Sequence, residues 1–264
     1  MIYCNLKGGL GNMLFQIATA KSLSIDNDTE CSFPNLYNHL KYLNYDNTHN
    51  PKLNYSIEYL DLLGHLRNDI PGKIKKVIYP FNYVETPKIV GDVLIDGFFQ
   101  SEKYFIHNRK EILKLFNFST IHNNTLKKYN DILNKKTTSI HVRRGDYIKF
   151  PNHHITQPIE YYNKSIELLK NKTDLFIVFS DDIMWCKNNL KIKNSIYIEN
   201  EKDYIELYLM SLCKHNIICN SSFSWWAAWL NKNKNKIIIG PKKWFGSSIN
   251  YNSDDIIPKN WIKL

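Results

Sequence analysis

The sequence has no run of about 18 apolar residues, the length that a membrane-spanning helix needs. Its first residues, Met-Ile-Tyr-Cys-Asn-Leu-Lys-Gly-Gly, have the pattern of a strand and a turn rather than of an apolar secretion signal. We therefore expect a soluble, cytoplasmic protein with no transmembrane segment. Hydrophobic residues make up 43% of the chain, enough to form cores, which excludes a disordered protein.

Cysteine is scarce, and its spacing carries no motif. The five cysteines include no C-x-x-C pair, and Cys4, Cys213 and Cys219 lie in apolar runs, where a thiol acts as a small hydrophobic group. This pattern predicts a reducing compartment, with neither a disulfide framework nor a zinc site. The sequence also lacks an H-E-x-x-H motif, a Walker A lysine and a nucleophile elbow, so nothing in it indicates a zinc protease, a P-loop enzyme or an α/β-hydrolase.

Acidic residues are outnumbered, with 25 Asp and Glu against 35 Lys and Arg, and the net charge is +10. A basic protein favours an anionic partner, which can be a nucleic acid, an anionic membrane surface or a phosphorylated small molecule. Much of the excess is lysine interleaved with asparagine, as at residues 231–236, which is typical of a solvated surface. The basic residues are scattered along the chain, so a nucleic-acid-binding protein stays a remote alternative.

Strand and helix patterns alternate along both halves of the chain. Residues 2–6 predict a strand, residues 7–11 a glycine turn, and a helix follows from Asn12. From residue 137 onward, strands alternate with helices up to residue 240. This alternation predicts an α/β protein with parallel sheets, divided into residues 1–135, residues 136–240 and a tail, 241–264, that packs back across the domains.

The polar stretches of the chain follow the predicted strands. In open α/β sheets, ligands bind beyond the carboxyl ends of the strands. Four stretches fall at such ends: residues 8–12, 141–147, 180–182 and 220–224. We expect the two halves to face each other across a cleft that these stretches line.

The stretch His-Val-Arg-Arg-Gly-Asp-Tyr, residues 141–147, places two adjacent arginines at a strand end. Side chains alternate along a strand, so His141 and Arg143 share one face, and Arg144 points the other way. Arginine is suited to bidentate phosphate binding, and we expect Arg143 to hold an anion. The alternative is an internal ion pair between Arg144 and Asp146, with Arg143 solvated.

Two other strand ends carry polar side chains. Ser221 and Ser222 precede an apolar helix, where their hydroxyl groups and the backbone N–H groups form an anion site or, in the alternative, only an N-cap. Asp181 can accept hydrogen bonds from a ribose or from guanine N1 and N2, whereas Asp182 is expected to cap the next helix. The turn at Gly8, Gly9 and Gly11 lacks the full dinucleotide fingerprint, so it is weak evidence for a cofactor.

Five stretches recur together, in this order, in one family: GGLGN at residues 8–12, GFFQSEKYF at 97–105, HVRRGDY at 141–147, FSDD at 179–182 and NSSFSWW at 220–226. On these motifs the chain resembles the α-1,2-fucosyltransferases of glycosyltransferase family eleven. The resemblance implies a GT-B-like fold of two Rossmann-like domains around a central cleft. It also implies transfer of L-fucose, with inversion, from GDP-L-fucose to a hydroxyl group of a glycan acceptor, O2 of a terminal β-galactoside. No cofactor and no metal are implied.

The resemblance also suggests roles for individual residues. Arg143 would bind the β-phosphate, Asp181 the guanine, and Asn12 would lie beside the reacting sugar. The implied donor-binding set is His141, Arg143, Arg144, Asp181, Ser221, Ser222, Gly9 and Gly11, and the implied catalytic set is Arg143, Asp146 and Asn12. Asp146 is the first candidate for a base at the acceptor hydroxyl, and Glu102 is the second. Met13 stands where the family commonly has glutamine, so the acceptor preference is open.

Two other activities fit the same predicted diphosphate site. One is a transferase that uses another GDP-deoxysugar or another acceptor hydroxyl. The other is a protein that binds a nucleotide sugar without catalysis. Incubation with candidate donors and acceptors discriminates among them.

Overall fold

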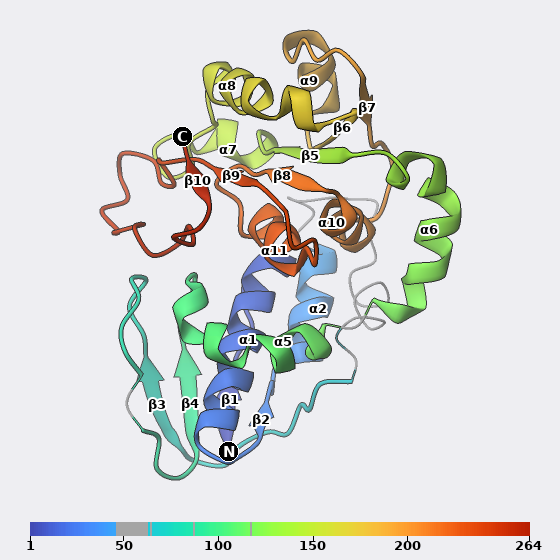
Figure 1. Cartoon of the computed structure of the whole chain (residues 1–264). Coiled ribbons are helices and arrows are strands. Elements are labelled where there is room, and N and C mark those ends of the chain that lie inside the picture. The colour runs from blue at the N-terminus through green and yellow to red at the C-terminus, as the bar shows by residue number, and fades with distance from the viewer. Residues whose placement is uncertain (46–62, 64, 87, 117) are drawn as a thin grey trace. The chain divides into compact units, whose positions relative to one another are not determined.

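The computed structural model describes residues 1–45, 63, 65–86, 88–116 and 118–264. The chain forms two compact units (Figure 1). Unit 1 consists of Met1–Phe118 with Tyr251–Pro258, and unit 2 of Ser119–Asn250 with Lys259–Leu264. Each unit is an α/β fold built on a parallel sheet, as the alternating sequence pattern predicts.

Unit 1 has a four-stranded sheet of order β2-β1-β4-β3. Its strands are β1 (Ile2–Cys4), β2 (Cys31–Ser32), β3 (Lys75–Ile78) and β4 (Val93–Asp96), and its helices include α1 (Leu10–Asp26), α2 (Leu36–Tyr45), η1 (Glu102–Tyr104), η2 (Ile106–Asn108) and α5 (Arg109–Leu115). Ile2 pairs with Val93 and Cys4 with Ile95, and these four side chains are buried on one face of the sheet.

The turn from β1 to α1 depends on glycine. Gly8 has φ +74°, a conformation that other residues rarely adopt. Gly9 is the N-cap of α1, and the helix begins at Leu10, so Asn12 is its third residue rather than its start.

Unit 2 has a six-stranded sheet of order β10-β9-β8-β5-β6-β7, and every pairing is parallel. Its strands are β5 (Thr137–Val142), β6 (Leu175–Ser180), β7 (Ser195–Tyr197), β8 (His215–Ile217), β9 (Ile238–Gly240) and β10 (Ile262–Lys263). Its helices are α6 (Ser119–Leu133), α7 (Gly145–Lys149), α8 (Ile159–Leu169), η3 (Lys170–Lys172), α9 (Ile183–Asn189), α10 (Asp203–Leu212) and α11 (Ser222–Leu230).

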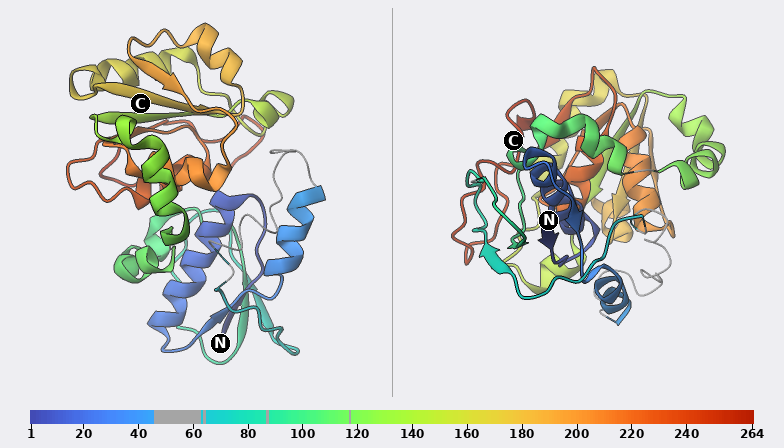
Figure 2. Two further views of the ribbon diagram at one scale, coloured as in Figure 1. Left: turned by 90° about the vertical axis from the view of Figure 1, so that its right-hand side faces the viewer. Right: turned by 90° about the horizontal axis from the view of Figure 1, so that it is seen from below.

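Helices cover both faces of the unit 2 sheet. Helices α8 and α9 lie on one face, and α10 and α11 on the other (Figures 1 and 2). Ile140, Val142 and Val178 of the central strands pack with Tyr162 of α8 in one core. Trp225 and Trp229 of α11, four residues apart on one helical face, are 0% and 2% exposed and stack with ring centroids 6.3 Å apart, so both serve packing.

The boundary between the units falls at residue 118, not at 135. Helix α6 belongs to unit 2 because it is bonded to that unit: the Tyr129 hydroxyl donates to Glu201 at 2.6 Å, and His122 contacts the Tyr208 hydroxyl. Residues 122–136 are rich in polar side chains, as in a linker between domains, but most of them belong to α6, an amphipathic helix with one covered face.

The tail divides between the units. Residues 251–258 are part of unit 1, where Asp255 pairs with Lys103 and the Tyr251 ring stacks on Phe81 at 4.8 Å. The last residues return to unit 2, where β10 pairs with β9. Among the helices in the described ranges, none combines the length and apolarity needed to cross a bilayer.

Candidate functional site

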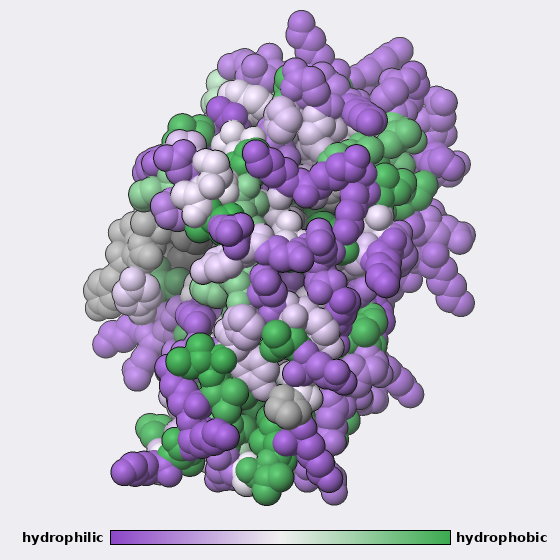
Figure 3. Space-filling view, turned by 90° about the vertical axis from the view of Figure 1, so that its left-hand side faces the viewer, coloured by the Kyte–Doolittle hydropathy of each residue, from purple (hydrophilic) through white to green (hydrophobic). Residues whose placement is uncertain are grey.

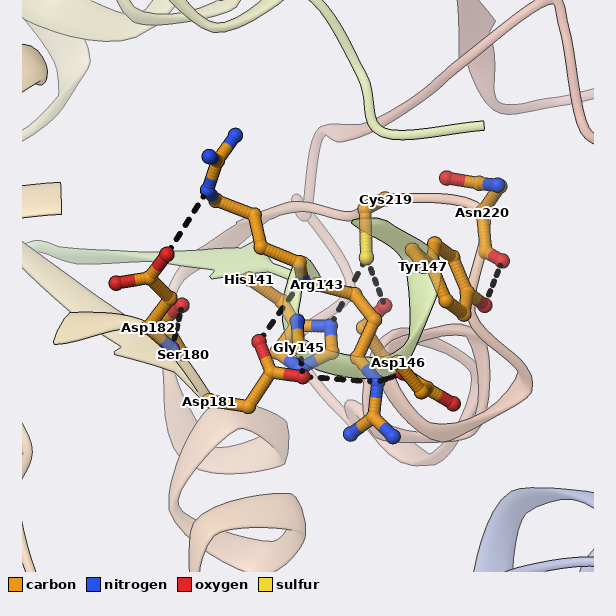
Figure 4. Close-up of polar contacts among 12 residues, drawn as sticks. His141, Arg143, Gly145, Asp146, Tyr147, Ser180, Asp181, Asp182, Cys219 and Asn220 are labelled. Atoms are coloured by element: carbon orange, nitrogen blue, oxygen red, sulfur yellow. Dashed lines mark hydrogen bonds and ion pairs between the residues drawn. The ribbon is translucent and has the colours of Figure 1, made fainter. Parts of the chain in front are cut away.

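The residues singled out in unit 2 meet at the carboxyl ends of β5 and β6. The register pairs His141 with Phe179 and Val142 with Ser180, so the turn after β5 lies beside Asp181 and Asp182. Figure 4 shows this cluster, with Asp181 facing the turn that carries Arg143 and Gly145. Parallel register thus brings together two polar stretches that lie almost 40 residues apart in the sequence.

Asp181 organises the turn after β5. Its Oδ1 accepts from the backbone N–H of Arg144 at 2.9 Å, and its Oδ2 accepts from that of Gly145 at 3.0 Å. The same Oδ2 lies 3.0 Å from Nε of Arg143. A Cβ on residue 145 would lie 2.9 Å from Oδ2 of Asp181, so this close approach requires glycine.

Arg143 is held by two carboxylates. Its Nε donates to Oδ1 of Asp146 at 2.8 Å as well as pairing with Asp181, and its side chain is 19% exposed. Burial disfavours its charge, but Asp181 and then Asp146 outweigh that effect and raise the pKa of Arg143 above its ordinary value. Within the described part of the chain its two Nη atoms have no hydrogen-bond partner, and in Figure 4 they point away from the other labelled side chains. The arrangement leaves the outer half of a planar cation available to an anion.

Arg144 has a different partner from the one considered in the sequence. Its Nε lies 3.1 Å from Oδ2 of Asp182, and its guanidinium stacks on the Trp185 ring at 4.0 Å. The alternative of an internal ion pair between Arg144 and Asp146 is therefore wrong. Residues 145–149 form helix α7, and the spacing of three residues places Asp146 beside Arg143 instead.

Asp182 caps helix α9, as predicted from its place at the strand end. Its side chain accepts from the backbone N–H of Trp185 at 3.1 Å. Arg144 is thus fixed to the body of unit 2 through a helix cap. It is separate from the outward-facing guanidinium of Arg143.

His141 lies in the interior with Cys219 as its neighbour. His141 is 5% exposed, and its Nδ1 lies 3.2 Å from Sγ of Cys219. Burial and then the charge of Arg143 lower the pKa of His141 to about 3, and burial raises the pKa of Cys219 to about 12. Both groups are therefore uncharged near neutral pH. The sequence pattern did not indicate Cys219 as a partner, because contact across strands β5 and β8 depends on their register.

Ser221 and Ser222 stand at the N-terminus of α11, beside the end of β8. Ser221 is the N-cap residue, but no side chain caps the helix through a hydrogen bond. The alternative, that these serines serve only as an N-cap, predicts such a hydrogen bond, and the structure shows none. Asn220 holds the loop in place, since its Nδ2 donates to the carbonyl groups of Ile155 and Trp244 at 2.9 Å each. The first backbone N–H groups of α11 and these two hydroxyl groups therefore lie at a helix end that can bind an anion.

Glu206 of α10 is a candidate site residue that the sequence pattern did not single out. It is partly buried, and in the described part of the chain its carboxyl group forms no hydrogen bond or ion pair. Burial first, and then the carboxylates of Asp203, Glu201 and Asp181, raise its pKa well above the usual value. An acidic residue within the apolar helix sequence Tyr-Ile-Glu-Leu-Tyr-Leu-Met was the signal that could have revealed it.

The predicted residues of the first half form a separate group in unit 1. Oδ1 of Asn12 accepts from Nε2 of Gln100 at 2.7 Å, and Gln100 is 9% exposed. Gly9 and Gly11 lie at the start of α1, and Glu102 begins η1. The unit 1 group is therefore an amide pair that joins α1 to the end of β4. Gln100 is a member that sequence reasoning had not assigned.

Among the described residues, no group of three or more His, Cys, Asp and Glu side chains is placed to hold a metal ion. The charged centre of the unit 2 site is instead an arginine with two carboxylates on its inner side. The outer side of such an arginine can donate charge-assisted hydrogen bonds to a phosphate group.

Comparison with known proteins agrees with the motifs. Residues 92–264 match the model of the family described as Glycosyl transferase family 11. The chain is 32% identical over its full length to two Escherichia coli proteins, the O-antigen biosynthesis glycosyltransferase WbnK and an alpha-1,2-colitosyltransferase; the matches cover 100% and 99% of those proteins.

Solved structures share the fold at low sequence identity. The fucosyltransferase NodZ from Bradyrhizobium matches with a TM-score of 0.54 at 12% identity, over 86% of this chain and 90% of that one. POFUT1 in complex with GDP matches with a TM-score of 0.51 at 12% identity, over 90% and 97%. The GT-B-like fold expected from the sequence is confirmed, and the chain belongs to glycosyl transferase family 11.

Proposed function

We propose that this glycosyltransferase moves L-fucose from GDP-L-fucose to a hydroxyl group of a glycan acceptor, O2 of a terminal β-galactoside. The observation that carries the proposal is the guanidinium of Arg143, which two carboxylates hold by its inner side while both Nη atoms stay available. The fold is shared with structures named as fucosyltransferases and as complexes with GDP.

The proposed roles of the unit 2 residues follow from the charge that develops in the reaction. Breaking the bond from sugar to phosphate leaves negative charge on the β-phosphate. Arg143 and the N-terminus of α11, with Ser221 and Ser222, would stabilise that charge more strongly in the transition state than in the ground state. His141, uncharged and buried, would line the nucleotide site. With these donors, we propose that the reaction needs no metal and no cofactor.

The geometry changes two of the assignments that the resemblance implies. Asp146 already accepts from Arg143, so we assign it to positioning that arginine, since a carboxylate paired in this way is a poor proton acceptor. Both oxygens of Asp181 are likewise bonded to the turn, which favours Glu206 as the group that reads guanine. In unit 1 we propose that Asn12, held by Gln100, lies beside the reacting sugar.

A second donor deserves the same test because a full-length relative is a colitosyltransferase. Colitose is L-fucose without its 3-hydroxyl group, so one site could accept either sugar. The experiment incubates the chain with GDP-L-fucose or GDP-colitose and a panel of β-galactosides, with and without EDTA, and detects products by mass spectrometry. We expect fucose transfer that EDTA does not abolish. Transfer of colitose alone would mean that GDP-colitose, not GDP-L-fucose, is the donor. Transfer of neither sugar to any acceptor would contradict the proposed function.

GDP should stabilise the folded chain, and other nucleoside diphosphates should do so less. A ligand that binds only the native state raises the unfolding free energy by about 2.7 kcal/mol at a hundred times its Kd. For a chain of this size we expect an increase in Tm of several degrees with GDP and much smaller increases with ADP and UDP. Thermal unfolding with each nucleotide checks this, and equal protection by all three would rule out a guanine-specific pocket.

The Glu206→Gln variant should show how guanine is recognised. A carboxylate has two oxygens that can accept from guanine N1–H and N2–H. The side-chain amide of glutamine has only one acceptor oxygen, and its NH2 group is a donor. Because the pKa of Glu206 is raised, wild-type affinity for GDP should increase as pH rises through that pKa, and the variant should lose this increase.

The raised pKa of Glu206 also predicts an effect on folding stability, which can be measured without ligand. A carboxyl group with a raised pKa favours the folded state at low pH, so its contribution to stability is lost as pH rises through the raised value. We expect Glu206→Gln to flatten this part of the curve of unfolding free energy against pH. A variant with unchanged GDP selectivity and an unchanged curve would remove Glu206 from the site.

A further inference from the structure

Exposed aliphatic side chains and lysines gather at one edge of unit 1. Among the large hydrophobic side chains that the structure describes, the three most exposed are Val90, Ile70 and Ile78, at 90%, 83% and 74%. All three come from residues 70–90, which also contain four lysines and one glutamate. Singly scattered apolar side chains are ordinary on a protein surface, but the concentration of the most exposed ones in one short segment is not.

The sheet register places these residues along one edge of unit 1, with Ile70 and Val90 before the strands at one end and Ile78, the last residue of β3, at the other end. Strand β3 is the edge strand, and Lys75 at its start pairs with Val93 at the start of β4. The segments that lead into the two strands, which contain Ile70 and Val90, therefore lie at the same end of the sheet, as Figure 1 shows. Figure 3 views this side of the molecule and shows green apolar side chains bordered by purple hydrophilic ones over its lower part. We name Ile70, Ile78, Val90, Lys73, Lys75 and Lys88 the β3-edge patch.

The charge of the patch is available to an external partner. In the described part of the chain, Lys73, Lys75 and Lys88 form no ion pair, whereas Lys76 pairs with Asp96 at 2.8 Å. The nearby acids Asp69 and Asp92 are already paired, with Arg67 and with the N-terminal ammonium group.

We propose that the β3-edge patch docks unit 1 on an anionic lipid surface. Lysines next to exposed isoleucine and valine side chains match the two parts of such a surface, because the lysines contact phosphate head groups and the aliphatic groups enter the head-group boundary. Addition of a strand from another chain fits less well, because β3 has only four residues and carries lysines, features that protect sheet edges from pairing. The proposal does not depend on which sugar the enzyme transfers.

The test is flotation of the full chain with vesicles of phosphatidylcholine alone or mixed with phosphatidylglycerol. We expect binding only to the mixed vesicles, weakened by salt. Changing Lys73, Lys75 and Lys88 to glutamine should lower the partition constant about a hundredfold, since each lysine near an anionic surface contributes about fivefold. The same change at Lys191, Lys193 and Lys234, exposed lysines of unit 2, is the matched control and should have little effect.

A second pair of variants tests the apolar part. Ile70→Ser, Ile78→Ser and Val90→Ser together should lower binding about tenfold or more and leave its salt dependence in place. Leu168→Ser with Met184→Ser, on unit 2, is the control. The affected side chains are exposed, so Tm should not change in any variant. The proposal would be overturned if the chain did not bind mixed vesicles, or if the control variants lost as much binding as the patch variants. It would also be overturned if the chain formed a dimer in lipid-free buffer and only the serine variant dissociated that dimer.

Discussion

Replacing Arg143 with alanine should abolish most of the turnover of this enzyme. Under the proposed function, the substitution removes the preorganised cation that would face the leaving β-phosphate. Loss of one such donor typically costs about 3–4 kcal/mol in the transition state, which is about a hundredfold to a thousandfold in kcat. The fold should weaken as well, because Asp146 and Asp181 then share a half-buried space without a counter-ion. Steady-state kinetics and denaturant unfolding on the same variant measure both effects.

Arg143→Lys separates the two roles of the arginine. Lysine keeps the positive charge between the carboxylates but has no planar fork with outward Nη atoms. We expect it to recover most of the stability that alanine loses and little of the turnover. Near-normal kcat in the alanine variant would show that Arg143 does not act on the leaving group.

Asp181→Ala should cause a larger loss of stability than Asp182→Ala. It leaves the backbone N–H groups of Arg144 and Gly145 without their acceptor and removes one partner of Arg143. These N–H groups lie at an exposed turn that water can reach, so each lost hydrogen bond costs about 0.5–1.5 kcal/mol, and we expect the unfolding free energy to fall by about 2 kcal/mol in total. Turnover should fall with it, because the turn that aims Arg143 is no longer fixed.

Asp182→Ala is the matched control for this effect. It removes the cap on α9 and the partner of Arg144, and loss of a helix cap costs about 1 kcal/mol. Chemical denaturation of both variants compares them directly. A smaller loss for Asp181→Ala than for Asp182→Ala would mean that the turn after β5 holds its shape without Asp181.

Local patterns in the sequence were sufficient to predict the strands and helices that carry the unit 2 site. The apolar run 175–179 predicts β6, and the carboxylate after it predicts a cap, because an aspartate between a buried strand and a helix satisfies free N–H groups within a few residues. Periodic placement of Trp225 and Trp229 likewise predicts packing. In each case the interaction lies within one or two helical turns of the chain.

The remaining contacts depend on how distant strands are registered. The pairing of Arg144 with Asp182, rather than with Asp146, follows from the alignment of β5 with β6, and the contact of His141 with Cys219 follows from the adjacency of β5 and β8. The hydrogen bond from Gln100 to Asn12 spans 88 residues. In the sequence, Glu206 looks like a solvent-facing helix residue. In the fold, three other carboxylates lie near enough to affect its pKa. These features could not be read from residue spacing, because spacing along the chain fixes neither register nor burial.

Titration calorimetry with GDP and GMP, on the wild type and on Arg143→Ala, tests the central claim most directly. GMP lacks only the β-phosphate, so the ratio of the two affinities measures what the protein gains from that group. If Arg143 holds the β-phosphate, the wild type should bind GDP at least about tenfold more tightly than GMP, since a hydrogen bond to a charged group contributes about 1.5–3 kcal/mol. The variant should lose most of that preference while still binding GMP as the wild type does. A ratio that is the same in both proteins would contradict the claim.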